Sequence, residues 1–101
     1  MLRLHGELDL ASVPLLQTEL AAVELEGAPL VLLDLRDLQF MDSTGLRAIL
    51  DAHERSQDRG QGFAVTRASD QVERLLKITR VSEHLRVIDS PDGELQTEPS
   101  E

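Results

Sequence analysis

The sequence predicts an α/β domain with a mostly parallel, four-stranded sheet. Short apolar segments with strand character alternate along the chain with segments whose apolar residues recur at helical spacing. Strands alternate with helices throughout, an order that favours parallel strands joined by right-handed crossovers. A chain of 101 residues is long enough for one hydrophobic core, which indicates a single domain.

The first strand and the first helix are predicted from periodicity and end signals. Residues 2–8 alternate apolar and polar, with the leucines on one face. Ser12 as cap and Pro14 in the first turn open a helix that Gly27 ends. Its apolar stripe consists of Leu16, Leu20 and Val23. We expect its glutamates to lie away from this stripe or at its margin, at Glu19, Glu24 and Glu26.

The centre of the chain predicts a buried strand, a short loop and a helix. The Val/Leu run at 30–35 is typical of a parallel strand covered on both faces. Asp34 is unusual within it, because a buried carboxylate needs partners; the alternative is that it marks an exposed strand end. After a loop at 37–43, Ser43 or Thr44 caps a helix over about 44–57. Its buried face is expected to contain Leu46, Ile49, Leu50 and His53.

The last third predicts one more strand, helix and strand. After a glycine-rich turn, residues 63–65 form a strand and Ser69 opens a helix. The apolar positions of that helix are Val72, Leu75, Leu76 and Ile78. A short strand follows at 85–88, and the acidic segment 90–101 is expected to be a disordered tail.

Composition excludes several classes of function. A net charge of −9 argues against binding to nucleic acids or anionic membranes and favours protein partners. The absence of cysteine excludes disulfides and thiolate metal sites. No apolar run approaches the roughly 20 residues of a membrane span, and no signal sequence opens the chain, so we expect a cytoplasmic protein.

Polar residues follow the first two strands and predict a site. Because the carboxyl ends of parallel strands meet at one edge, Asp9, Asp42 and Ser43 should lie together there. A phosphate on Ser43 would be stabilised by the unpaired N–H groups and the dipole of the helix N-terminus. The simpler interpretation is that Ser43 only caps the helix, that Asp42 assists it, and that Asp9 caps the first helix together with Ser12.

Three motifs carry a resemblance to a known family. They are Gly6-Glu7-Leu8-Asp9 before a helix, Phe40-Met41-Asp42-Ser43-Thr44-Gly45-Leu46 behind an apolar strand, and the helix sequence at 69–78. Together they resemble the STAS domain of bacterial anti-sigma factor antagonists, over residues 2–88. The resemblance implies a STAS domain at 1–89 and the tail at 90–101.

The resemblance also implies a function. In that family an anti-sigma factor, itself an ATP-dependent serine kinase, phosphorylates the motif serine, here Ser43. The unphosphorylated form binds the anti-sigma factor and frees the sigma factor, and a phosphatase resets the switch. The docking residues implied are Asp9, Asp42, Ser43, Thr44, Gly45 and Leu46. Thr44 is a second possible acceptor. No catalytic residue, cofactor or metal is implied, and no direct contact with nucleic acid or membrane.

Other functions fit the same residues less well. A hydrolase is disfavoured because Met41 stands where a GxSxG elbow has its first glycine, and no histidine is linked to Ser43. A receiver domain is disfavoured because its acidic cluster and late lysine are missing. The closer alternative is a STAS scaffold: a regulatory subunit of a lipid transporter, a part of a stress-signalling complex, or a nucleotide-binding module.

The chain departs from the family pattern at both ends. The usual first strand and last helix are missing, because only residues 1–5 precede Gly6 and the acidic tail follows the last strand. An exposed sheet edge is often relieved by pairing. Two explanations stay open: the sequence is truncated, or the protein forms a homodimer through that edge.

Overall fold

The structure, a computed structural model, describes residues 1–88 and confirms the predicted α/β class. Within that range one parallel sheet has the order β1 (Leu2–Leu8), β2 (Leu30–Met41), β3 (Gly62–Thr66) and β4 (Arg86–Ile88). The helices between the strands are α1 (Val13–Leu25), α2 (Ser43–Arg59) and α3 (Asp70–Ile78), and a 3₁₀ turn, η1 (Val81–Glu83), precedes β4. The expected tail at 90–101 lies outside the described residues.

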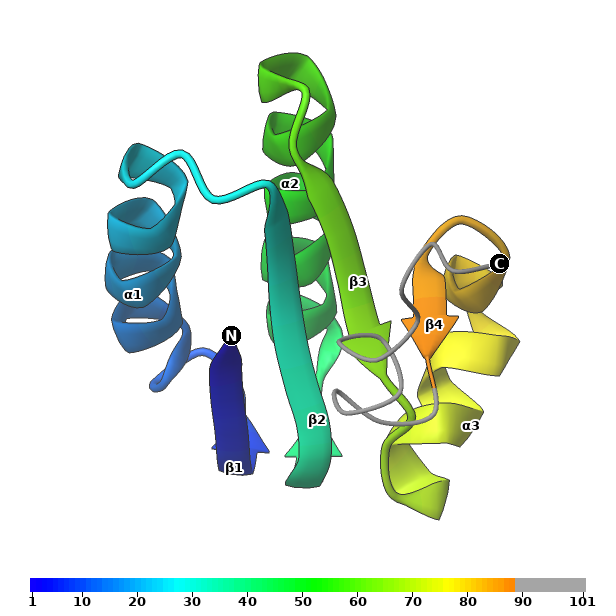
Figure 1. The fold of residues 1–101 in the computed structure, drawn as a ribbon. Helices are drawn as coiled ribbons and strands as arrows, with labels where there is room; N and C mark the ends of the chain where they lie inside the picture. Colours follow the sequence, from blue (N-terminus) through cyan, green and yellow to red (C-terminus); the bar gives the residue numbers. More distant parts are fainter. Residues whose placement is uncertain (89–101) are drawn as a thin grey trace.

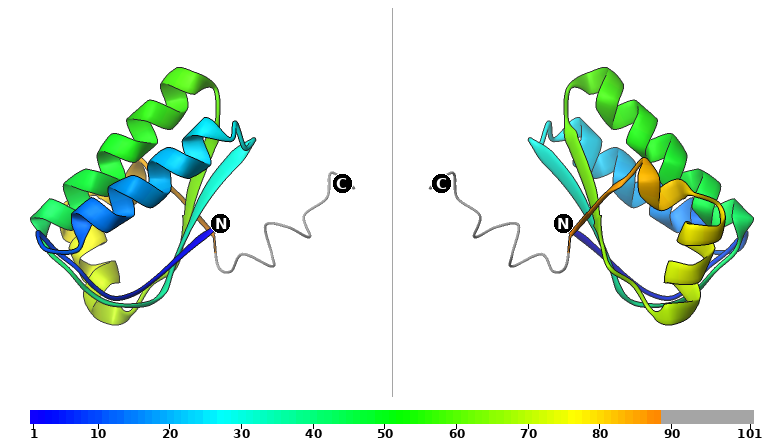
Figure 2. Two further views of the ribbon diagram at one scale, coloured as in Figure 1. Left: turned by 90° about the vertical axis from the view of Figure 1, so that its left-hand side faces the viewer. Right: turned by 90° about the vertical axis from the view of Figure 1, so that its right-hand side faces the viewer.

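The helices cover one face of the sheet (Figure 1). The two side views show α1, α2 and α3 on the same side of the strands (Figure 2). The hydrophobic core lies between the two layers and includes the fully buried Leu20, Leu33, Leu35, Ile49 and Leu76. The opposite face of the sheet carries no helix of the described chain.

Strand β2 is longer than predicted. It continues through the expected loop to Met41, so the prediction that the strand ends near residue 35 was wrong. In its second half the buried residues are Leu35, Leu38 and Met41, three positions apart. The pairing with β1 slips twice along this stretch, and each slip inserts one extra residue into β2. Because β2 is this long, its last residue, Met41, pairs with the last residue of β1, Leu8.

Two further expectations were wrong. Glu24 of α1 is buried, at 5% exposure, because it accepts hydrogen bonds from the Arg55 guanidinium of α2 at 3.0 to 3.2 Å. Ile78 was expected in the core but is 72% exposed at the end of α3. The other predicted core positions of α1 and α3 are buried or partly buried against the core.

Candidate functional site

The first two strands end side by side, as predicted. Leu8 pairs with Met41, so Asp9 and Asp42 each follow the last residue of a paired strand. The backbone N–H of Asp42 also donates to the carbonyl oxygen of Leu8 at 3.2 Å. The entrance to α1 and the start of α2 therefore share one edge of the molecule (Figure 1).

Asp42, and neither Ser43 nor Thr44, caps α2. Its backbone is extended, and its Oδ1 accepts a hydrogen bond from the Gly45 N–H at 2.9 Å. This hydrogen bond confirms the interpretation of Asp42 as a helix cap. Aspartate is among the residues that are preferred at this position. The expectation that Ser43 or Thr44 caps the helix was wrong.

Ser43 is the first residue of α2, and its side chain is exposed. Within residues 1–88 its hydroxyl makes no hydrogen bond, because the Asp42 carboxylate already serves the first turn. Thr44 is half-buried. Both residues border a shallow groove between α1 and α2 that is also lined by Val13, Gln17, Arg47, Ala48 and Asp51. Among the described residues, the serine hydroxyl is thus exposed and without a hydrogen-bond partner.

Gly45 and Leu46 fix the position of this serine. A Cβ atom on Gly45 would lie 2.6 Å from the carbonyl oxygen and 2.7 Å from Cγ of Leu8. Only glycine allows the helix to approach the end of β1 so closely. Leu46 is buried in the core, at 7% exposure. These two residues hold the start of α2 firmly against the sheet.

Asp9 organises the turn that leads into α1. Its Oδ1 accepts hydrogen bonds from the N–H groups of Ala11 and Ser12, both at 3.1 Å. The Ser12 hydroxyl accepts from the Asp9 N–H and lies within hydrogen-bond distance of the Glu7 carbonyl, both at 2.9 Å. Ser12 stands at the N-cap position of α1, but its side chain makes no capping hydrogen bond to the helix. The expectation that Ser12, alone or with Asp9, caps α1 was therefore wrong, because both side chains bond within the turn that precedes the helix.

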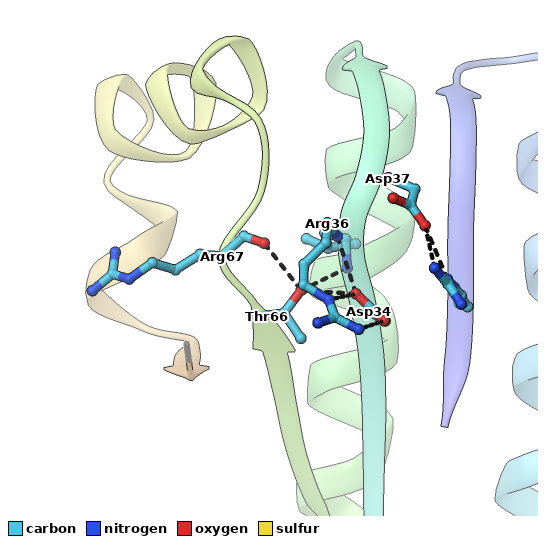
Figure 3. Close-up of polar contacts among 7 residues, drawn as sticks. Asp34, Arg36, Asp37, Thr66 and Arg67 are labelled. Atoms are coloured by element: carbon cyan, nitrogen blue, oxygen red, sulfur yellow. Dashed lines mark hydrogen bonds and ion pairs between the residues drawn. The ribbon is translucent and has the colours of Figure 1, made fainter. Parts of the chain in front are cut away.

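A second polar cluster lies on the sheet face opposite α2 (Figure 3). Asp34 is fully buried, and its two carboxylate oxygens accept hydrogen bonds from Arg36 Nε at 3.0 Å and Nη2 at 2.8 Å. The hydrogen bonds from the Arg36 side chain keep the pKa of Asp34 below its usual value. Thr66 Oγ1 accepts from the Leu35 N–H at 2.7 Å and lies 3.3 Å from Asp34 Oδ1.

This cluster ties β2 to the end of β3. The alternative that Asp34 marks an exposed strand end was wrong, because it is buried in the middle of β2. A sequence signal was present, since Arg36 stands two residues further along the same strand and therefore on the same face. The partner Thr66 lies on another strand, and the local pattern gives no sign of it.

Residues 1–88 contain neither a metal-binding cluster nor a membrane-spanning helix. No group of three or more His, Asp or Glu side chains is placed to hold a metal ion there. None of the helices in this range has the length and apolar character needed to cross a membrane.

The sequence model of the STAS domain family matches residues 1–93. The chain belongs to the STAS family. One relative of this STAS domain is the anti-sigma-B factor antagonist of Bacillus subtilis (strain 168), 29% identical over 91 residues; the match covers 90% of this chain and 83% of the relative.

Two solved structures have the same fold. An anti-sigma factor antagonist from Mycobacterium paratuberculosis superposes with a TM-score of 0.82 at 24% identity, over 92% of this chain and 79% of the other. A sulfate transporter family protein from Wolinella succinogenes superposes with a TM-score of 0.76 at 25% identity, over 89% and 75%. The fold is therefore shared by proteins with different names.

Proposed function

We propose that this STAS domain is an anti-sigma factor antagonist that works by partner switching. Its unphosphorylated form binds an anti-sigma factor that is also a serine kinase, and a sigma factor is released. Phosphorylation of Ser43 ends this binding. The observation that carries the function is the exposed Ser43 hydroxyl at the first position of α2, left free because Asp42 caps the helix. The family and the Bacillus subtilis relative support it.

The docking surface surrounds this serine. It consists of Asp9, Asp42, Ser43, Thr44, Gly45 and Leu46. The two hydroxyl residues offer side chains to the partner, and the two carboxylates place negative charge beside them. The last two residues are buried and act by holding the others in position. A partner packed here meets a neutral hydroxyl that follows Asp42 directly in the chain, at the edge where Asp9 also lies.

Phosphorylation changes the charge of this surface. A phosphoserine adds about −1.5 to −2 units of charge at neutral pH. Placed next to Asp42 and near Asp9, it makes an interface arranged for a neutral hydroxyl unfavourable. Within the free domain the α2 dipole offsets part of this repulsion by about 0.3 to 1 kcal/mol. The complex is therefore weakened more than the fold.

The chemistry is supplied by the partners. Ser43 Oγ attacks the γ-phosphorus of ATP, an O–P bond forms, and the bond from that phosphorus to the β–γ bridging oxygen breaks. ADP leaves, and the hydroxyl proton passes to a base of the kinase. A phosphatase later hydrolyses the phosphoserine with water and resets the switch. The domain itself is no enzyme in this scheme, needs no cofactor, and acts in the cytoplasm.

Replacing Ser43 with alanine tests this function. The domain is incubated with ATP and its anti-sigma factor kinase, and the modified peptide is identified by mass mapping. We expect phosphate on Ser43 in the parent and none in Ser43→Ala, which stays bound to the kinase because its side chain can never acquire the phosphate charge. Thr44→Ala is the control and still accepts phosphate. Equal phosphate incorporation in parent and Ser43→Ala would contradict the assignment.

A STAS scaffold or regulatory subunit of a lipid transporter or stress-signalling complex is the second candidate. The structural similarity to a sulfate transporter family protein favours it. Neighbouring genes distinguish the two: kinase or sigma factor genes accompany an antagonist, and permease genes accompany a transporter subunit. Absence of phosphorylation by any encoded serine kinase would favour the scaffold.

We also propose that β1 is a surface for a homodimer. In the described chain β1 pairs with β2 on one side only, so its other edge presents unpaired N–H and C=O groups. Light scattering of the purified 101-residue chain should give twice the monomer mass. A monomer at millimolar concentration would contradict this assembly.

A further inference from the structure

The groove beside Ser43 contains a cation that the proposed function has not yet used. Arg47 lies one helical turn after Ser43 on α2, and both line the groove between α1 and α2. Of the described residues that line this groove, Arg47 is the one with a positive charge. A positive charge four residues after a phosphate acceptor is well placed to act on it, because residues at i and i+4 are neighbours on a helix surface.

Arg47 is held weakly in the unmodified protein. Its Nε lies 3.4 Å from Asp51 Oδ1, one turn further along α2. The Arg47 side chain is 73% exposed and that of Asp51 45%. Exposed ion pairs of this kind contribute little and are readily exchanged, because water and salt screen them. Little free energy therefore opposes a different partner for Arg47.

A phosphate on Ser43 would be the stronger partner. Arg47 has the same spacing to Ser43 as to Asp51, namely four residues in opposite directions. A phosphate carries up to twice the charge of a carboxylate and three acceptor oxygens, which a guanidinium can bind with two N–H groups at once. The helix direction also favours this choice, because the acid then lies N-terminal to the base.

The two other carboxylates near Ser43 already have hydrogen-bond partners in the backbone, so they do not compete with the phosphate for Arg47. The Asp42 carboxylate accepts from the Gly45 N–H, and the Asp9 carboxylate accepts from two N–H groups in the turn before α1. The residues of α1 that line the groove, Val13 and Gln17, are both uncharged.

We propose that phosphorylation of Ser43 moves Arg47 from Asp51 to the phosphate. This exchange rests on the proposed function, and it extends the switch along α2. Arg47 then partly neutralises the phosphate. The Asp51 carboxylate, one turn after Arg47 along α2, loses its ion-pair partner. Two positions on the helix surface therefore change their charge when Ser43 is modified, and a partner that docks along the groove detects both.

The exchange is tested on protein that carries phosphoserine at position 43, inserted during translation so that no kinase is needed. A ³¹P NMR titration gives the pKa of the second phosphate ionisation in the parent and in Arg47→Gln. A unit charge at a contact distance of about 4 Å in water lowers this pKa by roughly 0.7 of a unit. We therefore expect the pKa to be higher by about that amount in Arg47→Gln.

Lys77→Gln is the matched control, because it removes one positive charge from an exposed position on α3. Its phosphate pKa should equal that of the parent. In a second measurement, the ¹⁵N NMR signal of Arg47 Nε–H should shift and exchange more slowly with water once position 43 carries phosphate. An unchanged pKa in Arg47→Gln together with an unchanged Nε–H signal would overturn the exchange.

The result is independent of whether a kinase modifies Ser43. If the kinase assay fails and the titration shows the expected shift, the partner-switching function is wrong and the ion-pair exchange is right. If the kinase modifies Ser43 and both the phosphate pKa and the Arg47 Nε–H signal stay unchanged, the function survives and Arg47 has no part in it.

Discussion

At the scale of single residues, Asp34 shows how a buried charge is accommodated. It lies in the middle of β2, fully buried, where an unpaired carboxylate would be very unfavourable. Arg36 reaches back along the same strand and binds both of its oxygens, while Thr66 approaches from β3 (Figure 3). The charge is therefore compensated within the sheet, and it also links two strands beyond their last paired residues.

Asp34 should make stability depend on pH in the acidic range. Because Arg36 lowers the folded-state pKa of Asp34, the stabilisation is complete above the unfolded value, 3.8, and is lost as the pH falls through the lower folded value. We expect Asp34→Asn to cost roughly 1 to 3 kcal/mol at pH 7. Urea unfolding between pH 7 and pH 2 should show a smaller loss of stability in this variant than in the parent.

The control for this titration is Asp37→Asn. Asp37 pairs with Arg3 at 2.9 Å, but the two side chains are 47% and 62% exposed. Such a pair contributes about 0 to 1 kcal/mol, so this variant should follow the parent closely. If Asp34→Asn and the parent lose equal stability on acidification, the Arg36 pairing does not hold the Asp34 charge.

At the scale of elements, the strands and helices were predictable wherever the apolar spacing stayed regular. The alternation in β1 and the helical spacing in α1 and α2 indicated the right structures. The second half of β2 was missed because the two slips against β1 stretch its buried positions to every third residue. A strand with this spacing does not show the alternation of apolar and polar residues that predicts a strand. Its polar residues therefore look like those of a loop.

The contact between α1 and α2 includes an ion pair that no local pattern reveals. Glu24 and Arg55 are 31 residues apart, and the Arg59 Nη1 also donates to the Glu24 carbonyl oxygen at 3.2 Å. A glutamate at the margin of an apolar stripe is usually solvated, so only the neighbouring helix decides its burial. The spacing of residues within α1 does not show that Arg55 of α2 lies beside Glu24.

A double-mutant cycle on Glu24→Ala and Arg55→Ala measures this contact. Since Glu24 is buried but Arg55 is 42% exposed on its side chain, we expect a coupling free energy of about 0.5 to 2 kcal/mol from urea unfolding. The same cycle on the exposed pair Arg47 and Asp51 is the control and should give at most about 0.5 kcal/mol. Equal coupling in the two pairs would show that burial of Glu24 adds nothing.

At the scale of the whole molecule, the sheet supports the candidate site without taking part in it. The rule that parallel strands end at one edge was enough to bring Asp9, Asp42 and Ser43 together in advance. Which residue caps α2 was not predictable, because three neighbouring side chains are all good caps. The Asp34 cluster could not be located either, since it needs the pairing of β2 with β3.

Phosphate on Ser43 should leave the whole fold intact. The site is exposed at the helix start, and the helix dipole compensates part of the repulsion from Asp42. We expect circular dichroism to show melting temperatures of the phosphorylated and unmodified domains within about 5 °C of each other. A drop of more than about 10 °C would mean that the modification acts by unfolding the domain.

The tight contact between Gly45 and Leu8 has a consequence for any enzyme that modifies this serine. The acceptor sits on a rigid mount formed by two chain segments, so it cannot be drawn out as an extended strand without breaking the end of the sheet. An enzyme that acted on Ser43 would therefore have to recognise the three-dimensional shape of the site instead of a linear motif. Short synthetic copies of residues 38–50 would lack that shape and make poor substrates.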